Sequence, residues 1–169
     1  MRNVQEFLAH AVVLEEEAAE RYDELADAME VHNNADVRDL FRRMAEYSRL
    51  HLAEAHSRAE AEGGALELKP WEFRWPGGES PEAGDMAQTD YLMSPREALL
   101  VALAAERRAF DFYHGVHGGD GHPRVRELAR AFAEEEAEHV AELRRWLRHY
   151  PAPADGGPEE DMDPPVAAD

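Results

Sequence analysis

The stretch that organises the chain reads Ala133-Glu134-Glu135-Glu136-Ala137-Glu138-His139. Glu136 and His139 are three positions apart, so a helix places both on one face. The remaining residues of that face are apolar, namely Val125, Leu128, Phe132, Leu143 and Trp146. Burying a carboxylate and an imidazole is costly unless a partner such as a metal ion compensates them. The stretch therefore predicts a helix with two metal ligands on its buried face.

The composition favours a single helical domain. A chain of 169 residues is long enough for one domain with a full core. Glycine and proline are concentrated in three places, which leaves long stretches of strong helix formers between them. We expect an all-α domain over residues 1–150. Residues 151–169 are rich in proline and acid and cannot bury enough apolar area to order themselves, which predicts a flexible tail.

Charge and residue usage exclude several functions. The formal net charge of −19 argues against binding to nucleic acid or to an anionic membrane surface. The absence of cysteine excludes disulfides, iron–sulfur clusters and any iron site of four cysteines within this chain. No run approaches the ~18 apolar residues of a membrane span, and the first residues lack the apolar core of a signal peptide. We expect a cytoplasmic protein.

Four segments show apolar residues at helical spacing, over about 4–31, 35–62, 95–117 and 123–149. Asn33 or Asn34 is placed to cap the second segment, and Ser94 with Glu97 forms a capping box for the third. The segment 64–93 has no helical period. A connection this long suits a chain that travels the length of a bundle before the next helix begins. The pattern predicts a four-helix bundle of two hairpins joined by a long crossover.

The crossover contains the alternating aromatic residues Trp71, Phe73 and Trp75. We expect them to pack over the bundle or against a partner subunit, although a strand is an alternative for this run. Exposed aromatic surface of this kind favours a homodimer.

An internal repeat relates the two hairpins. When Leu14–Tyr22 is aligned with Ala105–Tyr113, a Glu, an Ala and a Tyr coincide. Glu15 precedes His51 by 36 residues, and Glu106 precedes His139 by 33 residues. Each hairpin is therefore predicted to place one buried Glu on its first helix and one buried His on its second.

The candidate metal ligands all fall on the apolar faces of the four helices: Glu15, His51, Glu106, Glu136 and His139. Buried Glu is rare without a partner, and none of the four faces contains Lys or Arg, so we expect metal ligation. A network of hydrogen bonds between carboxylates and histidines is the alternative. Tyr22 and Tyr113 are candidate donors to the ligand carboxylates, and core packing explains them equally well.

Oxygen and nitrogen ligands in a bundle suit iron or manganese, and this combination of Glu and Glu-x-x-His is the di-iron carboxylate pattern. Over residues 4–150 the chain resembles the ferritin-like superfamily, and most closely its rubrerythrin-like branch. The resemblance rests on Glu15-x-x-Ala18-x-x-x-Tyr22, Glu106-x-x-Ala109-x-x-Phe112-Tyr113 and Glu134–His139. It implies two iron ions, one bound by Glu15 and His51, the other by Glu106 and His139, with Glu136 bridging both.

Ser48 departs from the family pattern, which places a second bridging Glu at that position. Three carboxylates leave two divalent cations with a net charge of plus one, so we expect the second ion to bind more weakly unless hydroxide or another acid compensates. Glu54 is the acid we expect nearest to the gap, towards the edge of the face. The family's rubredoxin-type domain is also absent from this chain, so an external protein would have to supply electrons.

The resemblance implies an oxidoreductase that reduces peroxide or oxygen, or that oxidises ferrous iron. Two alternatives stay open. The chain could be a non-catalytic protein that holds zinc, manganese or a single iron, or a helical interaction module whose metal site has decayed.

Overall fold

The computed structural model describes residues 1, 3–64, 66–81 and 92–154. Its long helices are α1 (Val4–Val31), α2 (Ala35–Ala61), α4 (Pro95–Gly118) and α5 (Pro123–Leu147), and η1 (Pro70–Glu72) is a short 3₁₀ helix. The described part of the chain contains no strand, which confirms the predicted all-α class. The bounds of the long helices lie within two residues of the predicted ones.

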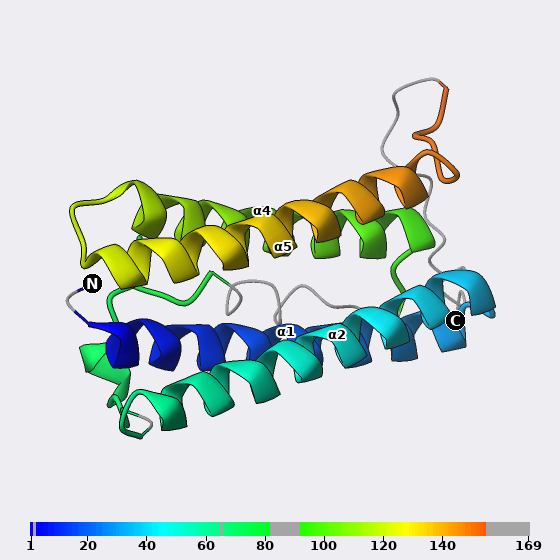
Figure 1. The fold of residues 1–169 in the computed structure, drawn as a ribbon. Helices are drawn as coiled ribbons and strands as arrows, with labels where there is room; N and C mark the ends of the chain where they lie inside the picture. The colour runs from blue at the N-terminus through cyan, green and yellow to red at the C-terminus, as the bar shows by residue number, and fades with distance from the viewer. Residues whose placement is uncertain (2, 65, 82–91, 155–169) are drawn as a thin grey trace.

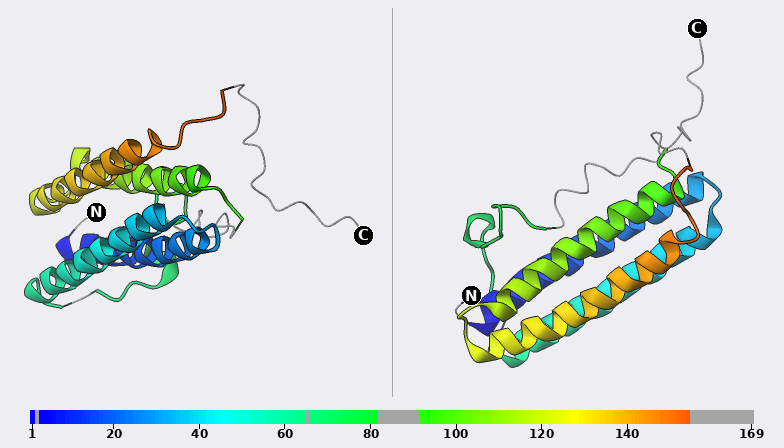
Figure 2. Two further views of the ribbon diagram at one scale, coloured as in Figure 1. Left: turned by 90° about the vertical axis from the view of Figure 1, so that its right-hand side faces the viewer. Right: turned by 90° about the horizontal axis from the view of Figure 1, so that it is seen from above.

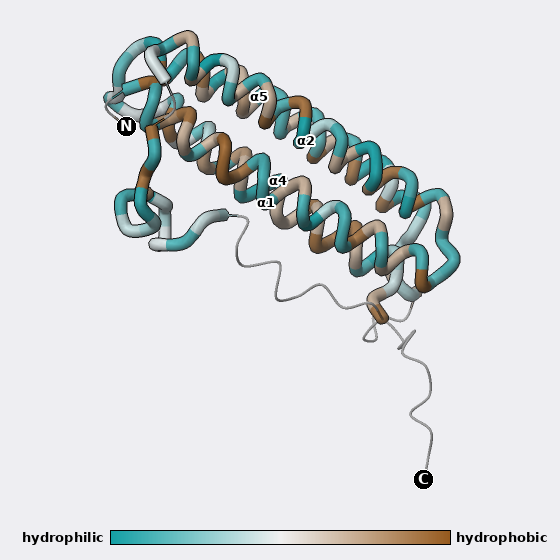
Figure 3. Tube along the Cα trace, turned by 90° about the horizontal axis from the view of Figure 1, so that it is seen from below, coloured by the Kyte–Doolittle hydropathy of each residue, from teal (hydrophilic) through white to brown (hydrophobic). Residues whose placement is uncertain are grey.

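The helices form two layers, each made of one antiparallel hairpin (Figure 1). The turned views place α4 over α1 and α5 over α2 (Figures 2 and 3). Because α2 and α4 run in the same direction, the chain has to travel back along the bundle between them. The predicted four-helix bundle of two hairpins with a long crossover is therefore confirmed. Part of the crossover and the predicted tail from residue 155 onward lie outside the described residues.

Side-chain caps fix the helix starts. The Asn34 side chain accepts a hydrogen bond from the Val37 backbone N–H at 3.0 Å at the start of α2. At the start of α4, the Ser94 hydroxyl accepts from the Glu97 N–H at 3.1 Å, and the Glu97 carboxylate accepts from the Ser94 N–H at 2.6 Å. These bonds satisfy backbone donors that have no partner within the helix, so both predicted caps form.

The core consists of two apolar clusters with a polar layer between them. One cluster extends from Tyr22 to Met29 along α1 and the other from Val4 to Leu14. The same division recurs on the other three helices, and the hydropathy of each helix alternates along its length (Figure 3). The buried residues between the clusters include small apolar ones, such as Ala105 and Ala109, and a polar set: Glu15, Ser48, Glu106 and Glu136. The site therefore lies at mid-length, with an apolar cluster on each side of it along the bundle.

The described part of the crossover packs on α1 through a buried histidine. The Arg74 backbone N–H donates to His10 Nε2 at 2.9 Å, so His10 Nδ1 carries the proton that it donates to the Glu6 carbonyl at 2.7 Å. The rings of Phe73 and Trp75 lie 5.0 and 4.6 Å from the His10 ring. These two aromatics thus pack over the bundle, as one of the sequence alternatives expects.

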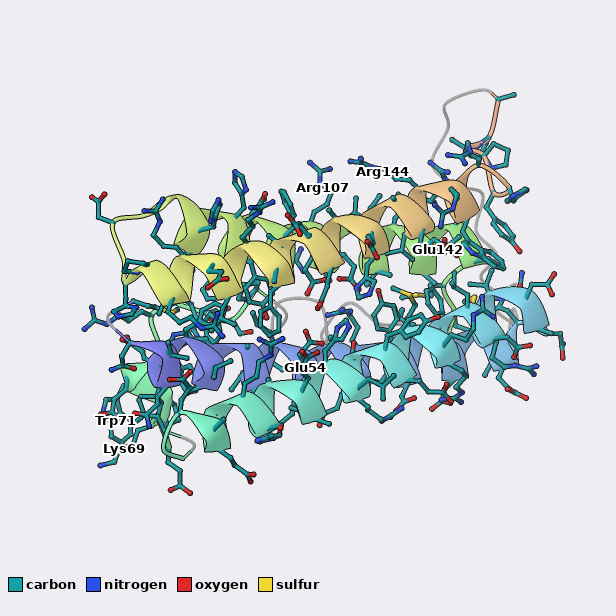
Figure 4. The ribbon with its side chains drawn as sticks, viewed as in Figure 1. Glu54, Lys69, Trp71, Arg107, Glu142 and Arg144 are labelled. Carbon is teal, nitrogen blue, oxygen red and sulfur yellow. The ribbon has the colours of Figure 1, made fainter. Side chains whose placement is uncertain are left out.

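Trp71 behaves differently from its aromatic neighbours. Its side chain is 77% exposed and, with Lys69, it projects from the bundle at the end where α1 begins (Figure 4). The run for which a strand is the alternative contains no strand, and only its first two residues belong to the short helix η1. Among the described residues, no helical stretch has the length and apolarity that crossing a bilayer requires.

Candidate metal centre

The fold brings the five predicted ligands into the polar layer. Glu15, Glu106 and Glu136 are buried, with exposed fractions of 3%, 3% and 6%. His51 and His139 face each other across the layer with ring centroids 5.7 Å apart and ring planes within 14° of parallel. The polar layer therefore brings together one histidine from each hairpin.

The ligands of the second hairpin are compact. His139 Nδ1 lies 3.6 Å from Glu106 Oε2 and 3.3 Å from Glu136 Oε2. One ligand atom from each of these three residues lies within 4.8 Å of the others. The Tyr22 hydroxyl, which comes from the first hairpin, donates a hydrogen bond to Glu106 Oε1. This group has the size and the donor atoms that one metal ion requires.

The ligands of the first hairpin are more open. Glu15 Oε1 lies 3.8 Å from His51 Nδ1. Both atoms are buried, and neither has a hydrogen-bond partner among the described residues. Leaving a buried polar atom unpaired costs about 1–3 kcal/mol. Two ligands on one metal, each at about 2.0–2.2 Å as for zinc, lie roughly 3–4 Å apart. A cation between Glu15 and His51 would therefore satisfy both atoms.

Tyr113 occupies the place in the second hairpin that Tyr22 occupies in the first. Its hydroxyl is buried and has no hydrogen-bond partner among the described residues. Burial and the nearby Glu15 carboxylate raise the pKa of Tyr113 well above its usual value. Tyr22 thus bonds to the carboxylate of the opposite hairpin, whereas Tyr113 only approaches one.

Protons balance the charges of the metal-free site. Burial, together with the charge of Glu106, raises the pKa of Glu15 to about 8 and that of Glu136 well above its usual range. Burial also opposes the ionisation of Glu106, but hydrogen bonds with His139 and Glu136 outweigh it and lower the pKa of Glu106. The pKa of His139 is raised to about 11, because its hydrogen bonds to Glu106 and Glu136 outweigh burial. A cation that enters this site has to displace protons.

Arg21 shows that one expectation from the sequence is wrong. The apolar faces contain no Lys or Arg, but the inference that no basic residue accompanies the ligands fails: Arg21, beside the apolar face of α1, is fully buried, with its guanidinium carbon 5.0 Å from the centre of the Tyr22 ring. Its positive charge opposes the rise in the pKa of Glu15 and adds to the lowering of the pKa of Glu106. Arg21 lies one helical turn after Glu17, which accepts a hydrogen bond from Ser80 of the crossover. The crossover covers a side of α1 that the helix pattern alone assigns to solvent.

A cleft of about 430 Å³ reaches the site between α2 and α5. His51 and His139 line it, and their side chains are 19% and 15% exposed, so the two histidines are less buried than predicted. The ring of Tyr47, also in the lining, lies parallel to the His139 ring within 13° at 6.3 Å. The carboxylates occupy the interior and the histidines the inner end of the opening.

Comparisons with known proteins address the family and the fold of the chain. A family model described as rubrerythrin matches residues 6–75. The crystal structure of an uncharacterized conserved protein from Magnetospirillum magnetotacticum MS-1 is 44% identical, with a TM-score of 0.73, over 90% of this chain and 98% of that chain. The chain belongs to the rubrerythrin family. None of the curated proteins matches it.

Ser48 of this rubrerythrin-family chain stands where the resemblance implies a second bridging Glu. It is buried, with 3% of its surface exposed, in the polar layer on α2. Glu54, the acid expected to compensate, instead accepts a hydrogen bond from Arg58 Nε at 3.0 Å on the exposed side of α2 (Figure 4). The expectation for Glu54 is therefore wrong, because its side chain turns along its own helix.

Glu135 is the acid that sequence reasoning missed. Its Oε2 lies 3.6 Å from His51 Nε2, across the cleft from α5 to α2. Burial raises the pKa of Glu135, while the nearby His51 opposes that rise. Glu135 lies beside the apolar face of its helix, so periodicity alone assigns it to solvent. The available signal was its position four residues before His139, which turns it towards the same cleft.

Proposed function

We propose that this rubrerythrin-family protein binds two iron ions between its hairpins and acts as an oxidoreductase. Its oxidant would be peroxide or dioxygen, or it would oxidise ferrous iron. The observation that carries the proposal is the pairing of a buried Glu with a His Nδ1 in each hairpin, at 3.8 Å for Glu15 and His51 and at 3.6 Å for Glu106 and His139. Glu136, between the two pairs, is the proposed bridging ligand.

The residues present suit iron in two respects. Carboxylate oxygen and imidazole nitrogen are ligands that iron, manganese and zinc all accept. The unpaired buried atoms Glu15 Oε1 and His51 Nδ1 leave a donor pair aimed at one point. Bound iron would supply one-electron redox chemistry, in which the hard carboxylate oxygens favour the ferric state. Family membership supports a di-iron protein, while the reaction itself is our proposal.

The surrounding residues divide the remaining tasks. The Tyr22 hydroxyl holds Glu106 in one orientation, whereas Glu15 Oε1 has no hydrogen bond among the described residues and can change its position. Without a bound metal, Glu15 has a pKa of about 8 and holds a proton at neutral pH, which it has to release when it binds an ion. The cleft beside His51 and His139 admits a small oxidant. Because the chain has no cysteine for an electron-transfer centre, we propose an external protein as the electron donor.

Anaerobic titration with ferrous iron, followed by peroxide, tests the proposal. We expect uptake of two iron ions per chain and, after peroxide, conversion of both to ferric iron in absorption and Mössbauer spectra. Glu134→Gln is a suitable control, because Glu134 lies on the same helix but is exposed and paired with Arg130 at 2.9 Å. Failure to bind iron, or two bound ions that peroxide leaves ferrous, would contradict the proposal.

A second candidate is a non-catalytic protein with one firmly held ion of zinc, manganese or iron. The compact group Glu106, Glu136 and His139 favours it, as does the buried Ser48 where a bridging carboxylate is expected. Elemental analysis of protein purified without added metal separates the two candidates. One zinc per chain, unaffected by peroxide, would support the second.

A further inference from the structure

His51 lies between two carboxylates from different helices. Its Nδ1 faces Glu15 Oε1 at 3.8 Å inside the bundle, and its Nε2 faces Glu135 Oε2 at 3.6 Å in the cleft. A histidine that binds a metal through one nitrogen usually donates the N–H of the other to a carboxylate or carbonyl group. That bond fixes the tautomer and the ring orientation, and it strengthens the metal-binding nitrogen.

We propose that Glu135 is a positioning residue for the metal site of the first hairpin. It accepts the Nε2–H of His51, which leaves Nδ1 as the ligand nitrogen beside Glu15. Its negative charge also offsets the carboxylate that Ser48 removes from the site. The inference rests on the proposed metal centre and extends it to a residue outside the ligand set.

The charge balance locates the effect. The ligand carboxylates Glu15, Glu106 and Glu136 leave two divalent ions with one positive charge, and the buried Arg21 adds to it, so a fourth carboxylate close to the site reduces the excess. Glu135 faces His51, which belongs to the same hairpin as Ser48. Its charge therefore lies beside the half of the site that lacks a carboxylate. His139 belongs to the hairpin that keeps its carboxylate, and its Nδ1 faces Glu106 and Glu136 at 3.6 and 3.3 Å.

Other acids near the cleft have different partners. Glu142 pairs with Arg145 and accepts a hydrogen bond from the Trp146 indole at 3.1 Å. Glu54 pairs with Arg58. Glu138 lines the same cleft, so it offers a control with the same charge at nearly the same place on α5. The contact of Glu135 with His51 Nε2 is the specific feature.

Anaerobic titration with ferrous iron, resolved into a stronger and a weaker site, measures the effect. We expect Glu135→Ala to weaken the weaker site by ~10–100-fold, the usual cost of losing an outer partner of a metal-bound histidine. Glu135→Gln, which keeps an acceptor oxygen but no charge, should lose less. The stronger site and the controls Glu134→Gln and Glu138→Gln should match the unaltered protein. If Glu138→Gln and Glu135→Gln lost equal iron affinity at the weaker site, the effect would come from the overall charge of the cleft. That result would overturn the inference.

Nitrogen-15 NMR of the zinc-loaded protein gives a second measurement. We expect His51 to carry its proton on Nε2, with slow exchange that persists in Glu135→Gln and is lost in Glu135→Ala. A zinc-bound Nε2, or proton exchange unchanged in Glu135→Ala, would overturn the inference and leave the proposed function standing. If the unaltered protein took up no metal, both the proposed function and this inference would be wrong.

Discussion

Each hairpin supplies one half of the candidate metal site, which we call a half-site, and the two half-sites differ in how closely their ligands are grouped. In the α4–α5 hairpin, Glu106, Glu136 and His139 gather within 4.8 Å, and Tyr22 secures the first of them. In the α1–α2 hairpin, Glu15 and His51 stand 3.8 Å apart with their facing atoms unpaired among the described residues.

The difference begins with one position in the repeat. Ser48 precedes His51 by three residues, as Glu136 precedes His139. Without a carboxylate there, the first half-site lacks both a ligand and a charge. One repeat can therefore keep its helices and its packing while its two copies differ in affinity for a cation.

Removing a histidine gives the largest expected effect. It tests whether the α4–α5 half-site binds iron more strongly than the α1–α2 half-site. Loss of a direct ligand should exceed the ~10–100-fold that an outer partner costs. We expect His139→Ala to abolish the stronger iron site and to disturb the weaker one through Glu136. His51→Ala should remove the weaker site alone, leaving one iron per chain in anaerobic titration. Equal stoichiometry in the two variants would contradict the ranking.

Ser48→Glu should make the halves alike. The added carboxylate restores charge balance, so we expect the weaker site to tighten by at least ~10-fold, since opposite charges attract strongly at short range within a protein. In the metal-free protein the same carboxylate is buried without a cation, which should lower the free energy of unfolding by about 3 kcal/mol. Urea unfolding with and without metal measures both effects. Ser48→Ala is the control, and a similar change in it would contradict the charge argument.

The two tyrosines allow a matched comparison of the halves without metal. Tyr22→Phe removes a hydrogen bond to the Glu106 carboxylate, so we expect a loss of about 1.5–3 kcal/mol in the free energy of unfolding. Tyr113→Phe removes a buried hydroxyl that has no partner among the described residues, and it should be neutral or slightly stabilising. Chelator-treated protein in denaturant titrations gives both numbers. Equal losses in the free energy of unfolding would mean that the two hydroxyl groups stabilise the protein equally, which would contradict this difference between the halves.

The smallest expected effect lies away from the ligands, where His10 in the first hairpin corresponds to Val101 in the second. Burial lowers the pKa of His10 below its ordinary value of 6.5. The unfolded chain therefore binds the proton more readily, so this contribution to stability is complete above pH 6.5 and is lost as the pH falls towards the lowered pKa. Protonation would break the bond from the Arg74 N–H, worth about 1 kcal/mol.

Urea unfolding at a series of pH values, followed by tryptophan fluorescence, measures this contribution. We expect the unaltered protein to lose more stability below pH 6.5 than His10→Gln does. Parallel curves for the two proteins would show that His10 does not hold the crossover in this way.

The sequence predicts the features that depend on a single helix. Helix bounds follow from caps such as Asn34 and Ser94, and the buried positions of Glu15, Glu106 and Glu136 follow from periodicity. The repeat further predicts that the hairpins face each other through these residues.

The sequence does not show what depends on the separation of helices and on the crossover. Arg21 is buried one turn after Glu17, which accepts a hydrogen bond from Ser80 of the crossover, and no helical period records either fact. The exposure of His51 and His139 depends on how far apart α2 and α5 stand. Glu135 reaches His51 for the same reason, since only the placement of the two helices brings its carboxylate across the cleft.

The hairpin repeat also has a consequence for symmetry. Two identical copies of the α4–α5 hairpin, facing each other as the two hairpins do here, would present four carboxylates and two histidines, enough to neutralise two divalent ions. In such a homodimer every substitution appears twice, so neither half could change alone. Joining the hairpins in one chain removes that constraint. The crossover that links α2 to α4 is thus what permits a serine in one half-site while the other keeps its glutamate.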